Sequence, residues 1–395
     1  MLIERTKIPS KTDPLHLSYH RSIELESGRL DITVRRAEWP PEDLCGFASR
    51  HNPSRGFLFV SKVLGKHYPV RPSVMTNLYA DLAERLAGLP LPEPVVMVAL
   101  AETSTGLGQG VFEASLTKNI WRRVVFLPTT RYFINKPVAL QIEETHCHAP
   151  THLVYEPAEP SLRQWFHQAA TLVLVDDEMS TGKTLMSLAR AFQNQNPELK
   201  NVVLVTITNW LGQEEQEDLA ADFPAEVDFV SILEGSFTFS QKPGWTICRN
   251  FKSVGNWTDK SWFIPRDSGR LGLGPKSPQP DLKAWRRSLK LDENRPVLVL
   301  GSGEFLYQPY RLAALLEDEG FDTVCQATTR TPIATGGAIE HILRFPDNYD
   351  EGLDNFLYNV RPDDDRQIVL AYETAPLSPE HDLPATLKAN ILFFL

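Results

Sequence analysis

The chain has 395 residues, a length that favours two or three domains over one. Hydrophobic residues make up 42% and charged residues 23%, as in an ordinary globular protein, so a sizeable core is expected and wholesale disorder is not. The net charge of −10 gives no overall cationic field for nucleic acid. The densest basic segment, 283–290, is interpreted first as a solvated helix face and second as a nucleic-acid contact.

Cysteine usage and hydropathy favour a cytoplasmic protein. The cysteines are far apart and form no CxxC motif, which fits a reducing compartment. The first residues hold no apolar signal core, and the longest apolar runs are too short to span a bilayer. We therefore expect no membrane contact.

Strand and helix patterns alternate along the first part of the chain. Apolar runs bounded by turn-forming residues predict strands at 30–36, 56–63, 94–101, 122–128, 138–144, 151–157, 171–177, 201–210 and 227–233. Helical patterns lie at 76–89, 161–170, 183–195 and 214–223. Thr76 is the expected N-cap of the first helix, and a Ser/Thr/Gly loop at 103–110 is expected before a further short helix. The alternation predicts an open α/β sheet with helices on both faces.

A Gly-, Pro- and Ser-rich stretch interrupts this pattern at 264–280, and the pattern resumes at 295 with a strand and a Gly turn. A helix at 309–320 and strands at 321–329 and 366–374 follow. We expect a first domain at 1–255, a linker at 256–290 and a second, smaller α/β domain at 291–395.

The segment "VDDEMSTGKT", residues 175–184, carries the clearest chemistry. Asp176 and Asp177 end a buried strand, and the turn that follows offers hydroxyls, backbone N–H groups and a helix N-terminus, which suit a phosphate. A P-loop is the first alternative and predicts ATP turnover that depends on Lys183, but its pattern requires Gly where Asp177 stands. Adjacent carboxylates suit a sugar phosphate, whose ribose hydroxyls they can bind, or a metal ion.

"LVLVDDEMSTGKT" resembles the PRPP-binding signature of the type I phosphoribosyltransferases. The resemblance implies a type I open parallel sheet with an N-terminal hood, and Mg²⁺ as cofactor. It implies that Asp176 and Asp177 are catalytic residues that hold the ribose 2- and 3-hydroxyls and are candidate Mg²⁺ ligands. The 5-phosphate would be bound by Ser180, Thr181, Gly182, Lys183 and Thr184.

One position departs from the purine-salvage members of that family. These members usually have an acidic residue just before Thr-Gly-Lys-Thr, where this chain has Ser180. The orotate-type enzymes have a hydroxyl there. A hypoxanthine or guanine acceptor is therefore less expected.

The resemblance implies roles for three further segments, each with a plain structural alternative. The pyrophosphate loop would be Glu102, Thr103, Ser104 and Thr105, which can also form an ordinary Gly-rich connection. The mobile catalytic loop would bring His146 and His148 to the site, with charge from Arg131 and Lys136. A hood would place Lys66 and Arg71 over the base. The cluster from His146 to His152 also leaves metal binding open, although its spacing matches no standard zinc site.

The whole chain resembles a narrower family, the phosphoribosyltransferase-like proteins found beside tellurium-resistance genes, which carry a C-terminal TRSP domain. The name-giving motif reads "TTRTP" at 328–332, and "GSGEFLYQP", "DNYDEG" and "NFLYNV" support the match. The resemblance implies a stress-linked pathway that makes a nucleoside-like metabolite, partners from the same operon, and a homodimer.

In the second domain, two turns follow strands at the carboxyl ends where open sheets bind ligands. The candidate ligand residues are Gly301, Gly303, Glu304 and Arg330. A binding or substrate-presenting role and a purely structural role both remain open. For the whole chain, the first hypothesis is a phosphoribosyltransferase that uses PRPP and Mg²⁺ to form or cleave an N-glycosidic bond to a base. The alternative is a non-catalytic sensor of PRPP or a nucleotide.

Overall fold

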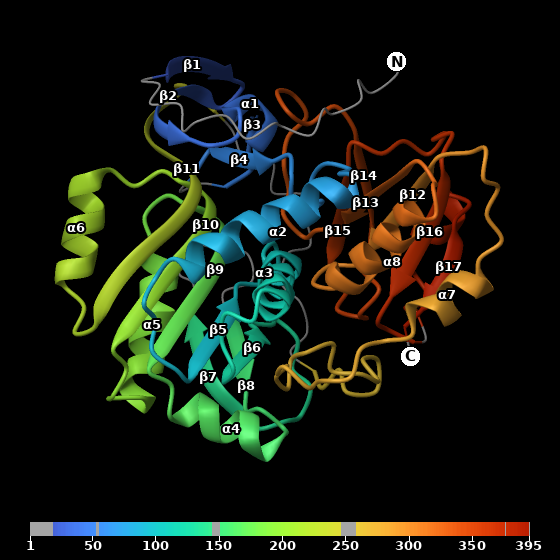
Figure 1. Cartoon of the computed structure of the whole chain (residues 1–395). Coiled ribbons are helices and arrows are strands. Elements are labelled where there is room, and N and C mark those ends of the chain that lie inside the picture. Colours follow the sequence, from blue (N-terminus) through green and yellow to red (C-terminus); the bar gives the residue numbers. More distant parts are fainter. Residues whose placement is uncertain (1–18, 53–54, 144–150, 246–257, 376, 395) are drawn as a thin grey trace.

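The computed structural model describes residues 19–52, 55–143, 151–245, 258–375 and 377–394. Two α/β units lie side by side, a larger one that carries the first half of the chain and a smaller one at the C-terminal end (Figure 1). The larger sheet has the strand order β1-β2-β11-β10-β9-β5-β6, and the smaller has the order β13-β12-β16-β17. The expected open α/β fold with a second, smaller α/β domain is confirmed.

The larger sheet is parallel from β11 to β6 and antiparallel at its β1–β2 edge. Its strands are β1 (Tyr19–Leu25), β2 (Gly28–Ala37), β11 (Glu226–Gln241), β10 (Asn201–Asn209), β9 (Thr171–Met179), β5 (Val95–Ala99) and β6 (Val124–Pro128). The central strands read as unbroken apolar runs because helices cover both of their faces.

Alternate residues of each central strand point to opposite helical layers. Val173 and Val175 of β9 pack in the layer that contains α2 (Pro72–Ala87) and α3 (Thr105–Thr117). Leu172 and Leu174 pack against α4 (Pro160–His167) and α5 (Lys183–Gln195) on the other face. The remaining helices of this part, α1 (Pro41–Leu44) and α6 (Gln213–Ala221), lie at the periphery (Figure 1).

The smaller sheet is parallel throughout. It contains β13 (Thr323–Ala327), β12 (Val297–Gly301), β16 (Gln367–Tyr372) and β17 (Asn390–Phe393). Helix α8 (Tyr307–Asp318) packs between this sheet and helices α2 and α3, so one hydrophobic core runs through both units. Helix α9 (Leu383–Thr386) and the hairpin β14 (Ile342–Pro346)–β15 (Asp354–Tyr358) contribute to the core on the other face.

Two further hairpins flank the larger sheet. The hood is β3 (Cys45–Ser49) paired with β4 (Phe57–Ser61), and its apolar side chains pack with Ile333, Ile339 and Tyr358 of the second domain. The other hairpin pairs β7 (Val138–Glu143) with β8 (Thr151–Tyr155). The expected N-terminal hood is therefore present, and it touches both units.

Two local expectations about helices differ from the structure. Helix α2 begins at Pro72 rather than at Thr76, whose hydroxyl donates to the Pro72 carbonyl inside the first turn. The loop expected at 103–110 is mostly helical, because its glycines serve close packing. A Cβ on Gly108 would lie 2.3 Å from the Ala99 Cβ, and one on Gly110 would lie 2.3 Å from the Tyr79 ring.

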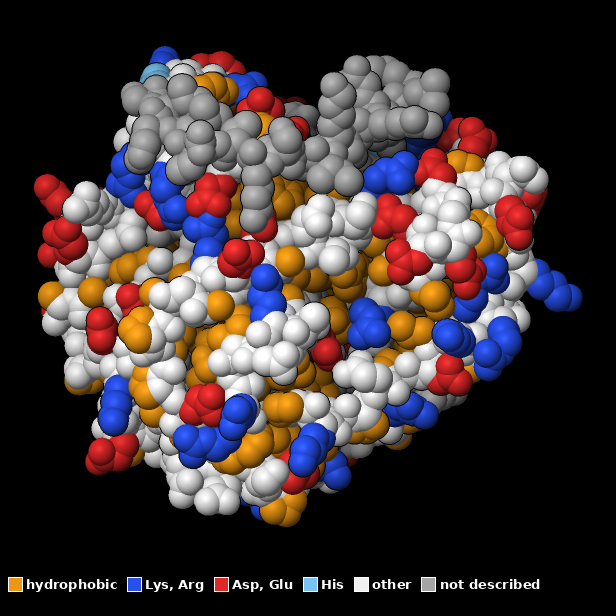
Figure 2. Space-filling model, in the orientation of Figure 1, with side chains coloured by type: hydrophobic (Ala, Val, Ile, Leu, Met, Phe, Trp, Pro, Cys, Tyr) orange, Lys and Arg blue, Asp and Glu red, His pale blue; other side chains and the backbone are white. Residues whose placement is uncertain are grey.

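The segment expected as a linker is packed, although most of it is irregular. Phe126 of β6 forms a β-bridge with Leu273, and Arg270 is 2% exposed. Helix α7 (Leu282–Ser288) follows, which confirms the helical interpretation of the basic segment. Its Arg286 pairs with Glu319 on the surface. Figure 2 shows Lys and Arg side chains mixed with acidic ones over this face. Among the described residues, no helix is long and apolar enough to cross a membrane.

Candidate functional site

The two aspartates of the opening motif meet the predicted pyrophosphate loop. Asp176 and Asp177 lie in the last part of β9 and are half-buried. The Ser104 hydroxyl donates to Asp176 Oδ1 at 2.8 Å and lies 3.5 Å from Asp177 Oδ1, and the Asp177 N–H donates to Asp176 Oδ1 at 3.0 Å. The contact follows from topology, because β5 and β9 are parallel neighbours and their carboxyl ends lie at the same edge.

Both carboxylates are harder to ionise than usual in this structure. Burial raises the pKa of Asp176 well above its ordinary value, and Asp177 beside it adds to the shift. Burial and the neighbouring Glu178 raise the pKa of Asp177 to about 6. A nearby cation or hydroxyl donors would stabilise the ionised form of these two crowded carboxylates. The pair therefore suits Mg²⁺, which prefers oxygen ligands, and the hydroxyls of a ribose.

The hood reaches the same acidic edge. Arg55, just before β4, pairs with Glu178 at 2.6 Å and lies over the Phe57 ring at 4.7 Å. Its charge lowers the pKa of Asp177 against the larger effect of burial. The sequence analysis missed Arg55, and the only signal for it was its position before the strand 56–63.

The predicted phosphate loop leads directly into α5. Ser180 and Thr181 form the turn, and helix α5 begins at Lys183. Gly182 has φ of 65°, and a Cβ there would lie 3.1 Å from Leu219 Cδ1, so this position requires glycine. Thr181 and Lys183 are exposed, and Thr184 lies in the first turn. A helix N-terminus preceded by hydroxyl groups is suited to a phosphate.

The remaining residues of the predicted pyrophosphate loop turn away from the aspartates. The Thr105 hydroxyl donates to the backbone carbonyl of Glu304 in the second domain at 2.7 Å. Glu102 pairs with Lys66 Nζ at 2.9 Å, and its other oxygen lies 3.8 Å from Nε of Arg330. Thr103 is half-buried. The loop therefore contacts the ribose-binding candidates on one side and the second domain on the other.

Of the residues expected near the base, the structure brings only some to this region. Lys66 is completely buried beside Glu102, whereas Arg71 lies at the start of α2 and pairs with Asp322 at 2.5 Å. Arg131 Nη2 contacts the Ala101 carbonyl at 3.4 Å, behind the pyrophosphate loop. Lys136 is exposed and lines a separate groove of about 1350 Å³.

The histidine cluster is only partly visible. His146 and His148 lie outside the described residues. His152 is 1% exposed, with Nδ1 2.9 Å from the Thr129 hydroxyl and Nε2 3.2 Å from Arg131 Nη2. Within the described ranges, no group of three metal-ligating side chains occurs.

The candidate ligand residues of the second domain face the first domain. Glu304 follows β12, and its carboxylate accepts hydrogen bonds from the Thr130 hydroxyl at 2.6 Å and the Arg131 N–H at 2.7 Å. The Gly303 carbonyl accepts a hydrogen bond from Lys66 Nζ at 2.6 Å. At Gly301 a Cβ would lie 2.0 Å from the Phe305 carbonyl oxygen, so glycine is required for the turn. The carboxyl-end loops of the two sheets thus meet each other.

A buried ion cluster that the sequence analysis missed holds this contact together. Arg270, from the expected linker, binds both oxygens of Glu373 at 2.7 Å and lies 3.1 Å from Glu304. Tyr349 donates to Glu373 at 2.9 Å and stacks on Tyr132 with ring centroids 4.1 Å apart. A Gly- and Pro-rich composition gave no sign that Arg270 would be buried.

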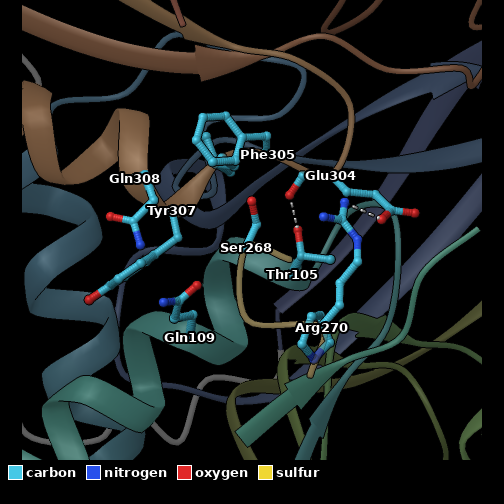
Figure 3. A pocket seen from close by; sticks show the side chains of 10 residues that line it. Thr105, Gln109, Ser268, Arg270, Glu304, Phe305, Tyr307 and Gln308 are labelled. Carbon is cyan, nitrogen blue, oxygen red and sulfur yellow. Dashed lines mark hydrogen bonds and ion pairs between the residues drawn. The ribbon is translucent and has the colours of Figure 1, made fainter. Parts of the chain in front are cut away.

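A small cavity of about 20 Å³ lies beside this cluster (Figure 3). Its lining includes Thr105 and Gln109 of α3, Ser268 and Arg270 of the packed segment, and Glu304. The cavity has room for about one water molecule and is too small for a substrate. It belongs to the contact between the domains.

The fold is that of an α/β protein with a second, smaller α/β domain, and comparison with known families identifies both parts. A family model described as phosphoribosyl transferase matches residues 44–236. A second, described as the TRSP domain C-terminal to that transferase domain, matches residues 267–387. The chain belongs to the family of phosphoribosyltransferase-like proteins fused to a TRSP domain. The division into domains at 1–255 and 291–395 with a linker at 256–290 stays a prediction. The second match begins at residue 267, inside that predicted linker.

Solved structures of purine phosphoribosyltransferases are similar at low identity. The adenine phosphoribosyltransferase of Trypanosoma brucei, in complex with AMP, pyrophosphate and ribose 5-phosphate, is 13% identical, with 49% of this chain and 77% of that chain covered and a TM-score of 0.35. The hypoxanthine phosphoribosyltransferase of Staphylococcus aureus is 14% identical, with 42% and 78% covered and a TM-score of 0.26. No curated protein sequence matches the chain significantly.

Proposed function

We propose that this protein transfers a phosphoribosyl group between PRPP and a nitrogenous base or base-like acceptor, with Mg²⁺ as cofactor. The observation that carries the proposal is the meeting of Asp176, Asp177 and Ser104, which joins the ribose-binding candidates to the expected pyrophosphate loop. The phosphate loop begins only three residues later, at Ser180. These groups match the parts of PRPP in the order ribose, pyrophosphate and 5-phosphate.

The reaction breaks the bond between C1 of the ribose and the pyrophosphate oxygen, which leaves with the electron pair. A nitrogen of the acceptor forms the new bond to C1 and loses its proton. Asp176 and Asp177 accept hydrogen bonds from the ribose hydroxyls, and their negative charge favours the positive charge that develops on the sugar. Asp176 and Asp177, with oxygen atoms of PRPP, would hold Mg²⁺, which would supply positive charge to neutralise the pyrophosphate.

The direct test is isothermal titration of the protein with PRPP in the presence of Mg²⁺. We expect binding that is lost when Asp176→Asn is combined with Asp177→Asn, since each amide has one acceptor oxygen instead of two and no negative charge to bind a cation. The matched control is Asp364→Asn, an acidic side chain that pairs with Arg366 in the second domain. Absence of PRPP binding by the wild-type protein, or equal binding by the double variant, would sink the proposal.

A non-catalytic sensor of PRPP or a nucleotide is the second candidate. It is favoured by the contact between Glu102 of the expected pyrophosphate loop and Arg330 of the second domain, which would let the second domain respond to an occupied loop. Pyrophosphate release across a panel of bases separates the two candidates. A transferase releases pyrophosphate with at least one base, and a sensor binds PRPP without turnover.

The proposed pathway is the synthesis of a nucleoside-like metabolite in nucleotide metabolism linked to stress or tellurium resistance. Its support is the resemblance of the chain to the family found beside tellurium-resistance genes, whose C-terminal TRSP domain this chain shares. The test is growth under tellurite of a strain that carries the Asp176→Asn, Asp177→Asn protein in place of the wild type. Equal growth of the two strains contradicts this assignment.

A further inference from the structure

Glu102 occupies an unusual place for a carboxylate. It lies in the loop expected to bind pyrophosphate, two residues before Ser104, which contacts Asp176. Its side chain is only 9% exposed, so bulk water does not screen its charge well. A buried negative charge at this position would repel the negatively charged pyrophosphate unless cations compensate it.

Two cations from outside the loop do compensate it. Lys66, from the segment that follows the hood, lies 2.9 Å from Glu102 Oε1. Arg330, from the "TTRTP" turn of the second domain, donates its backbone N–H to the same oxygen at 3.3 Å and places Nε 3.8 Å from Oε2. The side chains of Lys66 and Arg330 are 0% and 15% exposed, respectively.

Each cation is also held by a second partner, so the arrangement is fixed from both domains. Lys66 donates to the Gly303 carbonyl at 2.6 Å. Arg330 pairs with Glu351 at 2.5 Å, and its guanidinium lies 4.9 Å from the centre of the Tyr132 ring. Burial by itself would raise the pKa of Glu102, but Lys66 and Arg330 lower it below its ordinary value. Glu102 is therefore ionised between two positive charges.

We propose that Arg330 of the second domain is a positioning residue for pyrophosphate binding in the first domain. It acts through Glu102: together with Lys66 it neutralises and holds this carboxylate, so that the loop accepts the pyrophosphate of PRPP. The inference rests on the proposed function, because it assigns the loop to pyrophosphate. It gives the second domain a specific task at the transferase site, distinct from holding a ligand of its own.

The test uses the full-length protein with Mg²⁺ and two separate probes, inorganic pyrophosphate and ribose 5-phosphate. Arg330→Gln is expected to weaken pyrophosphate binding about tenfold and to leave ribose 5-phosphate binding unchanged. Arg330→Lys, which keeps the charge, is expected to recover most of the loss. Arg344→Gln is the matched control, since Arg344 pairs with Asp354 on an exposed face of the second domain.

A double-mutant cycle tests the route through Glu102. Glu102→Gln alone is expected to bind pyrophosphate about threefold more tightly, because it removes a repelling charge. In that background, Arg330→Gln is expected to cost less than about twofold. Lys66→Met is an independent variant on the other side of Glu102. It is expected to weaken pyrophosphate binding selectively, and Glu102→Gln is expected to suppress this loss. It replaces Arg330→Gln in the test if circular dichroism shows that Arg330→Gln does not fold.

The outcomes separate the inference from the proposed function. Wild-type protein that binds neither ribose 5-phosphate nor PRPP contradicts the proposed function and with it the inference. If the wild type binds PRPP, two results contradict the inference alone. The first is that Arg330→Gln weakens the binding of both probes equally. The second is that Arg330→Gln still causes the full loss of pyrophosphate binding in the Glu102→Gln background. In the last case Arg330 would act on the pyrophosphate directly.

Discussion

Single residues in the motif 175–184 decide which ligand the loop suits. Asp177 stands where a P-loop requires glycine, and the structure directs this carboxylate and Asp176 toward Ser104, in the loop between β5 and α3. Gly182 is the residue whose backbone conformation allows the turn into α5, with φ of 65°. The acidic pair and the glycine thus have separate tasks, which single substitutions can tell apart.

Gly182→Ala is expected to weaken ribose 5-phosphate binding about fivefold, which corresponds to about 1 kcal/mol. Alanine is strained at this positive φ, and its Cβ would meet Leu219 at 3.1 Å, so the turn before α5 would shift. Titration calorimetry measures the change. The matched control is Gly244→Ala, which has φ of 79° and no atom within 4 Å of the added Cβ. Equal effects of both variants would show that Gly182 has no special role in phosphate binding.

His67 makes the stability of the fold depend on pH. Burial, with Lys66 beside it, lowers the pKa of His67 to about 3. The ordinary pKa in the unfolded chain is about 6.5, so below that pH the unfolded state binds the additional proton. The free energy of unfolding therefore falls as pH decreases, by up to about 1.4 kcal/mol per pH unit below about pH 6.5.

The measurement is urea unfolding of the wild type and of His67→Gln at several pH values between about 7 and 5. The wild type should lose about 2 kcal/mol more than the variant over this range, because glutamine does not titrate. Parallel curves for the two proteins would contradict the shifted pKa.

Among the elements, buried parallel strands and the helices that follow them were predictable from sequence, since their apolar runs and periodicity are local signals. The helix 183–195 and the strands near 171 and 201 agree with the structure to within a few residues. Strand β11 was predicted to end at 233 but continues to Gln241, where it pairs with β2. In its second half Phe237 and Phe239 alternate with polar, partly exposed residues, and this half extends the strand by pairing with β2.

Helix α3 shows how a local rule can fail. Gly106, Gly108 and Gly110 predict a loop by composition, yet all three lie in the helix. Gly108 allows α3 to approach β5, and Gly110 allows it to approach α2, more closely than a side chain would permit, whereas Gly106 lies against Leu306. Packing between elements outweighed the low helix propensity of glycine.

Gly110→Ala is therefore expected to destabilise the protein by about 1–3 kcal/mol, although alanine favours helices. The new Cβ would lie 2.3 Å from the buried Tyr79 ring, which packs edge-on against Tyr310 of α8. Urea unfolding measures the change. Gly88→Ala, at the end of α2 with φ of −76°, is the control and should stay within about 0.5 kcal/mol of the wild type. Greater stability of Gly110→Ala would show that α2 and α3 can separate without cost.

At the scale of the whole molecule, two sheets present their carboxyl-end loops to each other. The motif 175–184 and the turns at 301–304 and 328–332 were predictable as loops at the carboxyl ends of strands, because each follows an apolar run. The contact between the loop 102–105 and these turns of the second domain was not predictable, since nothing local relates Glu102 to Arg330 across 228 residues. Arg270 was missed for the same reason, because a residue in an irregular segment takes its environment from the domains on either side.

The contact between the domains can be tested at Arg270. Arg270→Met removes the partner of Glu373 and Glu304, whose side chains are 1% and 3% exposed, and leaves two carboxylates buried without their cation. Loss of one partner of a buried ion pair costs about 3–5 kcal/mol. We expect the variant to unfold at lower temperature and in two steps, since this cluster joins β6, the packed segment and the second domain. Calorimetry measures both effects.

Arg270→Met with Glu373→Gln should recover part of the loss, and Arg344→Gln should unfold like the wild type. A single transition at the wild-type temperature in Arg270→Met would mean that the hydrophobic core shared by α2, α3 and α8 alone joins the two domains.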